Sequence, residues 1–125
     1  MRLHRHLLAA TILAAAAPAL AGPVEDFQKL QDDYWATVLK DNPLFATQVG
    51  VKTYDRQLGP LSLAELDRQT AQAAAFLRRL EAIPAAGLPA SEQASRAILK
   101  RQLEDAVEAN RYGQRQLLYS TLGSY

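Results

Sequence analysis

The chain has 125 residues, enough for one domain or part of one, with 14 basic and 13 acidic residues and a formal net charge of +1. This near-neutral balance, scattered along the chain, gives no electrostatic footprint for nucleic acid, so we expect no nucleic-acid partner. The sequence contains no cysteine, which excludes disulfides, cysteine zinc ligands and attachment of a lipoprotein lipid.

Residues 1–21 have the pattern of a secretory signal peptide. Arg2 and Arg5 give a positive start, residues 7–17 are uncharged and apolar, and small residues precede a cleavage point between Ala21 and Gly22. The apolar run is shorter than the roughly 20 residues of a membrane-spanning helix. We therefore expect an exported protein, periplasmic or secreted, with no stable membrane anchor after cleavage.

Cleavage would remove both histidines, His4 and His6, together with Arg2 and Arg5. The remaining chain then has 12 basic and 13 acidic residues, a net charge of −1. Zinc sites are built mostly from His and Cys, and His is the usual general base near neutral pH. A Ser-His-Asp triad cannot be assembled, and we expect no catalytic residue, metal ligand or cofactor in residues 22–125.

Residues 24–40 show apolar spacings of three and four, typical of an amphipathic helix. Pro23 lies near the start of this helix, where its missing N–H has no cost. The apolar stripe consists of Val24, Phe27, Leu30, Tyr34 and Val38, widened by Trp35 and Leu39.

Asn42-Pro43 predicts a stop and a new start, because Pro disfavours the α conformation of the preceding residue and Asn is a good N-cap. A short helix follows, and Gly50 is expected to end it in the left-handed conformation. Residues 51–58 are predicted to be extended or looped. The apolar side of the short helix is predicted to consist of Leu44, Phe45 and Val49.

Two longer helices are predicted over residues 62–83 and 91–112. Ser62 begins a Ser-Leu-Ala-Glu capping box, Ser91 is the expected N-cap of the second helix, and Gly113 is its expected terminal residue. The short connection between them favours an antiparallel hairpin. The apolar faces are formed by Leu63, Leu66, Thr70, Ala73, Phe76, Leu77 and Leu80, and by Ala94, Ile98, Leu99, Leu103, Ala106 and Val107.

Residues 114–125 are apolar without a clean helical period, which suggests a chain that continues in a larger protein. Alanine-rich stripes bury little area, so we expect marginal stability for the segment alone. The apolar residues of this stretch are Leu117, Leu118, Tyr119, Leu122 and Tyr125.

Several residues in the first helix invite a chemical role. Asp32 and Asp33 are paired carboxylates, but neighbouring helix positions point about 100° apart, so a solvated surface is the better interpretation. Tyr34 and Trp35 could stack a ligand. Core packing of both rings, with their polar atoms satisfied at the edge, fits their character better.

The same comparison applies further along the chain. Tyr54 and Asp55 lie on a loop, where functional residues concentrate, but a local turn hydrogen bond from Asp55 is the simpler role. The carboxylates of Glu104, Asp105 and Glu108 could bind a hard cation through their oxygens, but the basic residues around them favour an ordinary charged surface. The pair Arg78-Arg79 is likewise interpreted as a solvated surface.

The spacing of these residues resembles the start of the DUF885 family of bacterial, often exported proteins. The resemblance is carried first by Phe27, Leu30, Asp33, Tyr34, Trp35, Leu39, Pro43, Ala46, Thr47, Gly50, Tyr54, Asp55, Leu58, Leu61 and Ser62. It continues through Phe76, Leu77, Leu99, Leu103, Glu104, Tyr112 and Gly113, which resemble that family's N-terminal helical hairpin. It extends over residues 24–125.

This resemblance implies a large all-α fold similar to gluzincin-type zinc metallopeptidases, whose His-Glu and Gly-His-His motif lies far downstream. No residue here matches that motif, so zinc is expected only in a missing C-terminal part. The family-pattern residues expected to have a structural role are Tyr34, Trp35, Pro43, Ala46, Thr47, Gly50, Tyr54 and Asp55.

Two hypotheses follow. In the first, residues 22–125 are the N-terminal cleft-wall or lid segment of an exported peptidase, inactive alone. Residues 24–58 would then dock on the missing catalytic region, residues 62–112 would form an outer hairpin, and a peptide substrate would be a further partner. In the second, the chain is a standalone exported helical binding protein, with residues 117–125 packed on its helices or forming a dimer face.

Overall fold

The computed structural model describes residues 22–59 and 62–113, and within these ranges the fold is all α-helical. The elements are α1 (Pro23–Asp41), α2 (Pro43–Gln48), the 3-10 turn η1 (Lys52–Tyr54), α3 (Leu63–Glu81), the 3-10 turn η2 (Ala85–Gly87) and α4 (Ala90–Arg111). The all-α prediction is confirmed, and the three long helices end within two residues of their predicted bounds. The proposed leader up to Ala21 and the apolar residues of 114–125 lie outside the described ranges.

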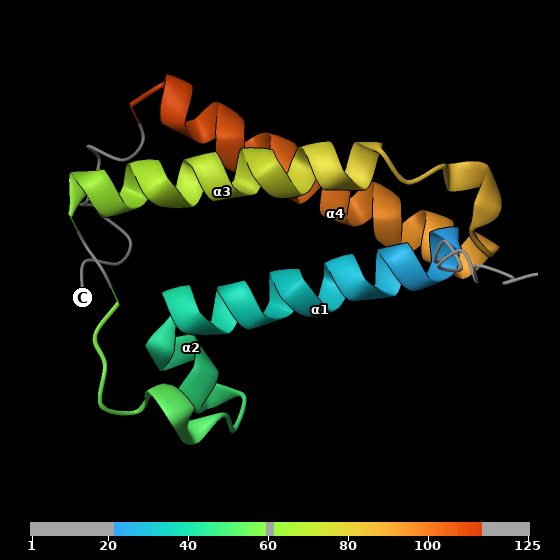
Figure 1. Ribbon diagram of the computed structural model, residues 1–125. Coiled ribbons are helices and arrows are strands. Elements are labelled where there is room, and N and C mark those ends of the chain that lie inside the picture. The colour runs from blue at the N-terminus through green and yellow to red at the C-terminus, as the bar shows by residue number, and fades with distance from the viewer. Residues whose placement is uncertain (1–21, 60–61, 114–125) are drawn as a thin grey trace, which may run out of the picture.

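The three long helices form a bundle with a small lobe at one end. Helices α3 and α4 run antiparallel as the predicted hairpin, and α1 lies along α3 in the opposite direction (Figure 1). Turn η2 passes over the start of α1, while α2 and η1 fold together beyond the end of α1. None of the described helices has the length and hydropathy to cross a lipid bilayer.

Helix α1 ends where Asn42 leaves the helical conformation, at φ −128° and ψ 73° before Pro43. Asn42 occupies the N-cap position of α2, but its side chain does not cap that helix. Instead its Nδ2 donates to the carbonyl of Val38 at 2.9 Å, and so does its backbone N–H at 3.0 Å. Asn42, expected to cap the start of α2, therefore caps the carboxyl end of α1 instead, because the last carbonyls of a helix have no partner within the helix.

The ends of the hairpin helices follow their local chemistry. The hydroxyl of Ser62 accepts from the N–H of Glu65 at 3.2 Å, which confirms the predicted cap of α3. The prediction that Ser91 caps α4 is wrong. Pro89 takes the extended N-cap conformation and its carbonyl accepts from Gln93 N–H at 2.9 Å, so the helix begins one residue before Ser91.

One continuous core joins α1, the hairpin and η2. Its buried residues are Phe27, Leu30, Phe76, Leu80, Ile83, Leu88, Leu99 and Leu103. Phe27, Leu30, Leu80 and Leu103 have almost no solvent contact. Of the residues predicted for the apolar faces of the hairpin, Leu63, Ala94, Ile98 and Ala106 are exposed instead.

The seam between α1 and η2 depends on a small residue. A Cβ atom placed on Gly87 would lie 2.7 Å from Cγ of Pro23, well inside van der Waals contact. Further along, Arg96 of α4 donates to the carbonyl of Leu80 at 3.0 Å, at the end of α3. The close approach of Gly87 to Pro23 thus places the connection against α1, while the Arg96 hydrogen bond ties α4 to the end of α3.

Candidate functional site

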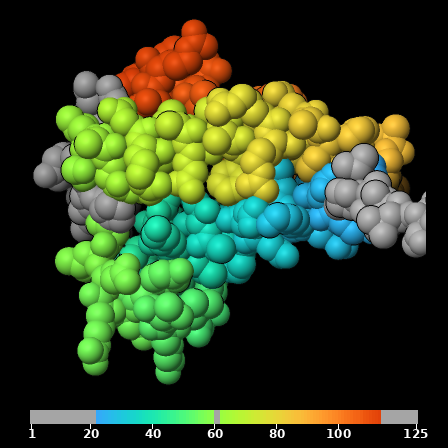
Figure 2. Space-filling view, in the orientation of Figure 1, coloured from blue at the N-terminus to red at the C-terminus, as the bar shows by residue number. Residues whose placement is uncertain are grey.

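Residues 43–55, here called the α2–η1 lobe, are held together by side-chain and backbone hydrogen bonds. The hydroxyl of Thr47 donates to Oδ1 of Asp55 at 2.6 Å, across eight residues. Val51 N–H donates to the carbonyl of Ala46 at 2.8 Å. Gly50 makes the reversal with φ +88°, a conformation that costs other residues roughly 1–2 kcal/mol. Figure 2 shows the lobe projecting from the flank of the bundle.

The lobe brings together six of the eight residues of the family pattern: Pro43, Ala46, Thr47, Gly50, Tyr54 and Asp55. Their roles in the structure are packing, turn formation and hydrogen bonding. The local hydrogen bond expected for Asp55 is made to Thr47 of α2, and it ties the loop back onto the helix.

The other two family-pattern residues, Tyr34 and Trp35, lie on α1 and have different environments. Tyr34 is half-buried with its ring edge-on to Phe76 at 5.4 Å, and burial raises the pKa of its hydroxyl. The prediction that Trp35 also packs in the core is wrong. Trp35 is 47% exposed, and its ring meets that of Phe45 edge-on at 5.8 Å. Helix α1 packs in the core through the face that carries Phe27 and Leu30. Trp35 lies on a neighbouring face, where its ring contacts Phe45 of the lobe.

Helix α2 faces its neighbours with the side opposite to the predicted one. Pro43 and Ala46 are buried, whereas the side chains expected to face inward, Leu44, Phe45 and Val49, are exposed. The reason is steric: a small residue allows the short helix to approach the end of α1 closely. The large apolar side chains are consequently exposed to solvent, and one of them, Phe45, contacts Trp35.

A groove of about 580 Å³ opens between α2, the loop after η1 and the start of α3. Its apolar lining includes Leu44, Phe45, Leu58 and Leu66. Leu44 is 69% exposed and Leu58 87% exposed. Leu58 and Leu66 were not among the site residues expected from the sequence. The available signal was Leu58 itself, a large apolar residue within a loop that has no apolar period.

Comparison with known proteins gives one match. Residues 43–124 match the family described as "Bacterial protein of unknown function (DUF885)". The chain belongs to the DUF885 family. The match begins at Pro43, so Tyr34 and Trp35, which carried part of the resemblance, lie outside it. No curated protein and no solved structure matches the chain.

In this DUF885 chain the paired carboxylates of α1 do not converge. Asp32 is exposed, while Asp33 accepts from Arg79 of α3 at 2.6 Å and lies 3.6 Å from Lys29. The hydrogen bond from Arg79 lowers the pKa of Asp33. Arg79 also lies over the ring of Phe76, 5.3 Å from its centroid, so it has a defined place at the helix interface as well as an exposed head.

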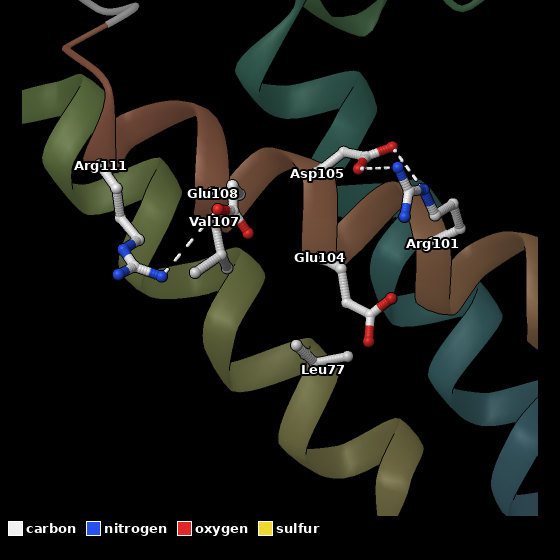
Figure 3. A pocket seen from close by; sticks show the side chains of 7 residues that line it. All are labelled: Leu77, Arg101, Glu104, Asp105, Val107, Glu108 and Arg111. Carbon is white, nitrogen blue, oxygen red and sulfur yellow. Dashed lines mark hydrogen bonds and ion pairs between the residues drawn. The ribbon is translucent and has the colours of Figure 1, made fainter.

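Three acidic residues of α4, Glu104, Asp105 and Glu108, line a second groove of about 380 Å³ (Figure 3). Each has a basic neighbour on its own helix: Glu104 lies 2.8 Å from Lys100, Asp105 3.1 Å from Arg101, and Glu108 4.0 Å from Arg111. Figure 3 shows their carboxylates directed apart. The hydrogen bond from Lys100 to Glu104 and the smaller effect of its hydrogen bond to Glu81 raise the pKa of Lys100. This face is a set of solvent-exposed surface ion pairs, which contribute little to stability.

A zinc ion, which the family resemblance implies for a larger protein, does not fit the described residues. No group of three His, Cys, Asp or Glu side chains converges anywhere in 22–59 or 62–113. The carboxylates of four acidic residues are each paired with a guanidinium or ammonium group, which a metal ion would have to displace: Asp33, Asp41, Glu104 and Asp105. No step of any reaction is therefore assigned to zinc on these residues.

Proposed function

We propose that residues 22–125 form one wall or lid of the substrate cleft in an exported, zinc-dependent peptidase of the DUF885 family. The metal and the reacting groups would belong to another part of the protein. The observation that carries this proposal is the set of large apolar side chains that the α2–η1 lobe holds in solvent.

The lobe has the properties of a surface built to meet another surface. Leu44 and Phe45 of α2 and Val49 at its C-cap are exposed, and the ring of Phe45 contacts that of half-exposed Trp35. The Thr47–Asp55 hydrogen bond fixes the loop that follows. Apolar patches of this kind on soluble proteins usually mark contacts with partners or ligands.

The charge distribution supports a positioning role for the lobe. Residues 42–51 contain no charged side chain, and the single carboxylate of the lobe, that of Asp55, already accepts a hydrogen bond from Thr47. A wall that contacts peptide and neighbouring protein needs shape and apolar area instead. In this proposal, α3 and α4 hold the lobe from outside the cleft.

A second candidate, a standalone exported binding protein, is favoured by the closed core of the bundle. Phe27, Leu30, Leu80 and Leu103 are fully buried without any further partner. Such a protein would use the same lobe as its contact surface. The two candidates differ in whether metal-binding residues follow in the same polypeptide.

The test has two parts. Zinc titration by calorimetry, and hydrolysis of a mixed peptide library with zinc added, should give no stoichiometric binding and no cleavage with the purified chain. Binding of one zinc ion per chain would refute the proposal that the metal site belongs to another part of the protein. Sequencing the gene beyond codon 125 then separates the candidates: a continuing frame with His-Glu and Gly-His-His supports the wall, and an immediate stop codon supports the binding protein.

A further inference from the structure

We propose that the groove beside α2 binds a short, uncharged apolar stretch of peptide in an extended conformation. This inference rests on the proposed function, because it gives the wall segment a substrate class to recognise. It assigns the recognition to the groove lined by Leu44, Phe45, Leu58 and Leu66.

The size and lining of the groove fit such a ligand. Its volume of about 580 Å³ falls within the roughly 300–1,000 Å³ that is usual for ligand sites. Leu44 and Phe45 come from α2, Leu58 from the loop and Leu66 from α3, so apolar groups approach a bound chain from three elements. This arrangement can receive an apolar side chain of the peptide between them.

Polar groups suited to a peptide main chain accompany the apolar ones. Three residues with side-chain amides also line the groove: Asn42, Gln48 and Gln69. Nδ2 of Asn42 donates to the carbonyl of Val38, and the amide oxygen of Asn42 remains available as an acceptor. Gln48 and Gln69 make no side-chain hydrogen bond to the described residues. A Gln amide offers both donors and an acceptor, which matches the N–H and C=O groups of an extended peptide.

Charge decides the class of peptide. Asp41 is the single charged residue among those that line this groove, and its carboxylate is held by Arg68 at 2.7 Å with only 11% of the side chain exposed. A charged peptide side chain would therefore lose water in the groove without gaining an opposite charge, which is costly. Uncharged side chains carry no such penalty, so the lining selects them.

Trp35 supplies the readout, since it is the chain's single tryptophan and its ring contacts Phe45 of the groove. The probe is N-acetylated, C-amidated Ala-Phe-Leu-Ala, added to the full chain. Its matched control is Ala-Asp-Lys-Ala with the same blocked ends and the same zero net charge. The expected result is a saturable change in Trp35 emission with Kd below about 1 mM for the apolar peptide, and no saturable change for the charged one.

Two exposed sites provide matched variants. Leu44→Asp places a charge in the groove, and Ile98→Asp places one on α4, away from it. Both side chains are largely exposed, so both variants should keep the helical circular dichroism of the parent chain. Leu44→Asp should weaken the apolar peptide at least tenfold, while Ile98→Asp should leave its Kd within about twofold.

Other results would overturn the proposal. These are equal binding of the charged peptide, equal weakening by the two variants, or no saturable binding. A dimer in sedimentation that Leu44→Asp abolishes would assign the groove to a second copy. If the double variant Leu117→Asp/Leu118→Asp binds the peptide more tightly, the chain's own residues 114–125 would be the occupant of the groove, because the variant weakens their competition with the peptide. Zinc binding or peptide cleavage by the chain would instead refute the proposed function, whatever the peptide affinity.

Discussion

Leu103→Ala should destabilise the bundle much more than Ile98→Ala, although the sequence places both residues on one apolar face. Leu103 is 1% exposed at the centre of the core formed with α1 and α3. Its truncation loses about 2–3 kcal/mol of transfer free energy and leaves a cavity. The expected loss in free energy of unfolding is about 3 kcal/mol, within the range of about 2–5 kcal/mol measured for Leu→Ala in cores.

Ile98 provides the control on the same helix, because it is 61% exposed. Ile98→Ala should change the free energy of unfolding by less than about 0.5 kcal/mol, and the better helix propensity of Ala offsets part of any loss. Urea unfolding followed by circular dichroism at 222 nm measures both variants. A loss of about 3 kcal/mol lowers Tm by roughly 12–24 °C in a domain of this size. Equal losses at the two sites would refute the packing described for α4.

Three further predictions concern the lobe and the α1–α3 interface. Thr47→Val removes the hydroxyl that donates to Asp55 and should cost about 0.5–1.5 kcal/mol in urea unfolding; Thr47→Ser should restore most of it. Gly50→Ala forces a side chain into φ +88° and should cost about 1–2 kcal/mol, so an unchanged urea midpoint would contradict the turn. The hydrogen bond from Arg79 lowers the pKa of Asp33 in the folded chain, so its stabilisation is present above the ordinary carboxyl pKa of 3.8 and is lost as pH falls through the lowered value. The difference in urea midpoint between the parent and Asp33→Asn should therefore shrink between pH 6 and pH 2, and a difference that grows on acidification would be inconsistent with the pair.

The sequence predicts the long helices well because each carries several signals that agree. Helix α3 has a cap at Ser62, an apolar period and a proline shortly after its end. Gly50 and Gly113 take the positive φ values expected of helix-terminal glycines. The sequence placed the N-cap of α4 at Ser91, but Pro89 takes the extended N-cap conformation and the helix begins at Ala90.

The candidate site was harder to predict, because its geometry depends on which neighbour each residue meets. A six-residue helix is too short for its apolar period to define one face, so the sequence could not show that Ala46 is buried while Leu44 and Phe45 are exposed. Trp35 was placed in the core because large aromatic residues usually lie there. Its exposure follows from the face of α1 that packs in the core, the face of Phe27, Leu30 and Tyr34, and a local pattern does not specify that face.

Acrylamide quenching of Trp35 fluorescence tests the central claim most directly, namely that the family-pattern lobe presents its apolar side to solvent. The chain has one tryptophan, so the signal comes from this site alone. Trp35 is 47% exposed beside Phe45. The account therefore predicts that the acrylamide quenching constant of the folded chain is a substantial fraction of the constant measured for the chain unfolded in urea. A Trp35 that acrylamide quenches only after unfolding would contradict the account, since the lobe would then turn its apolar side inward.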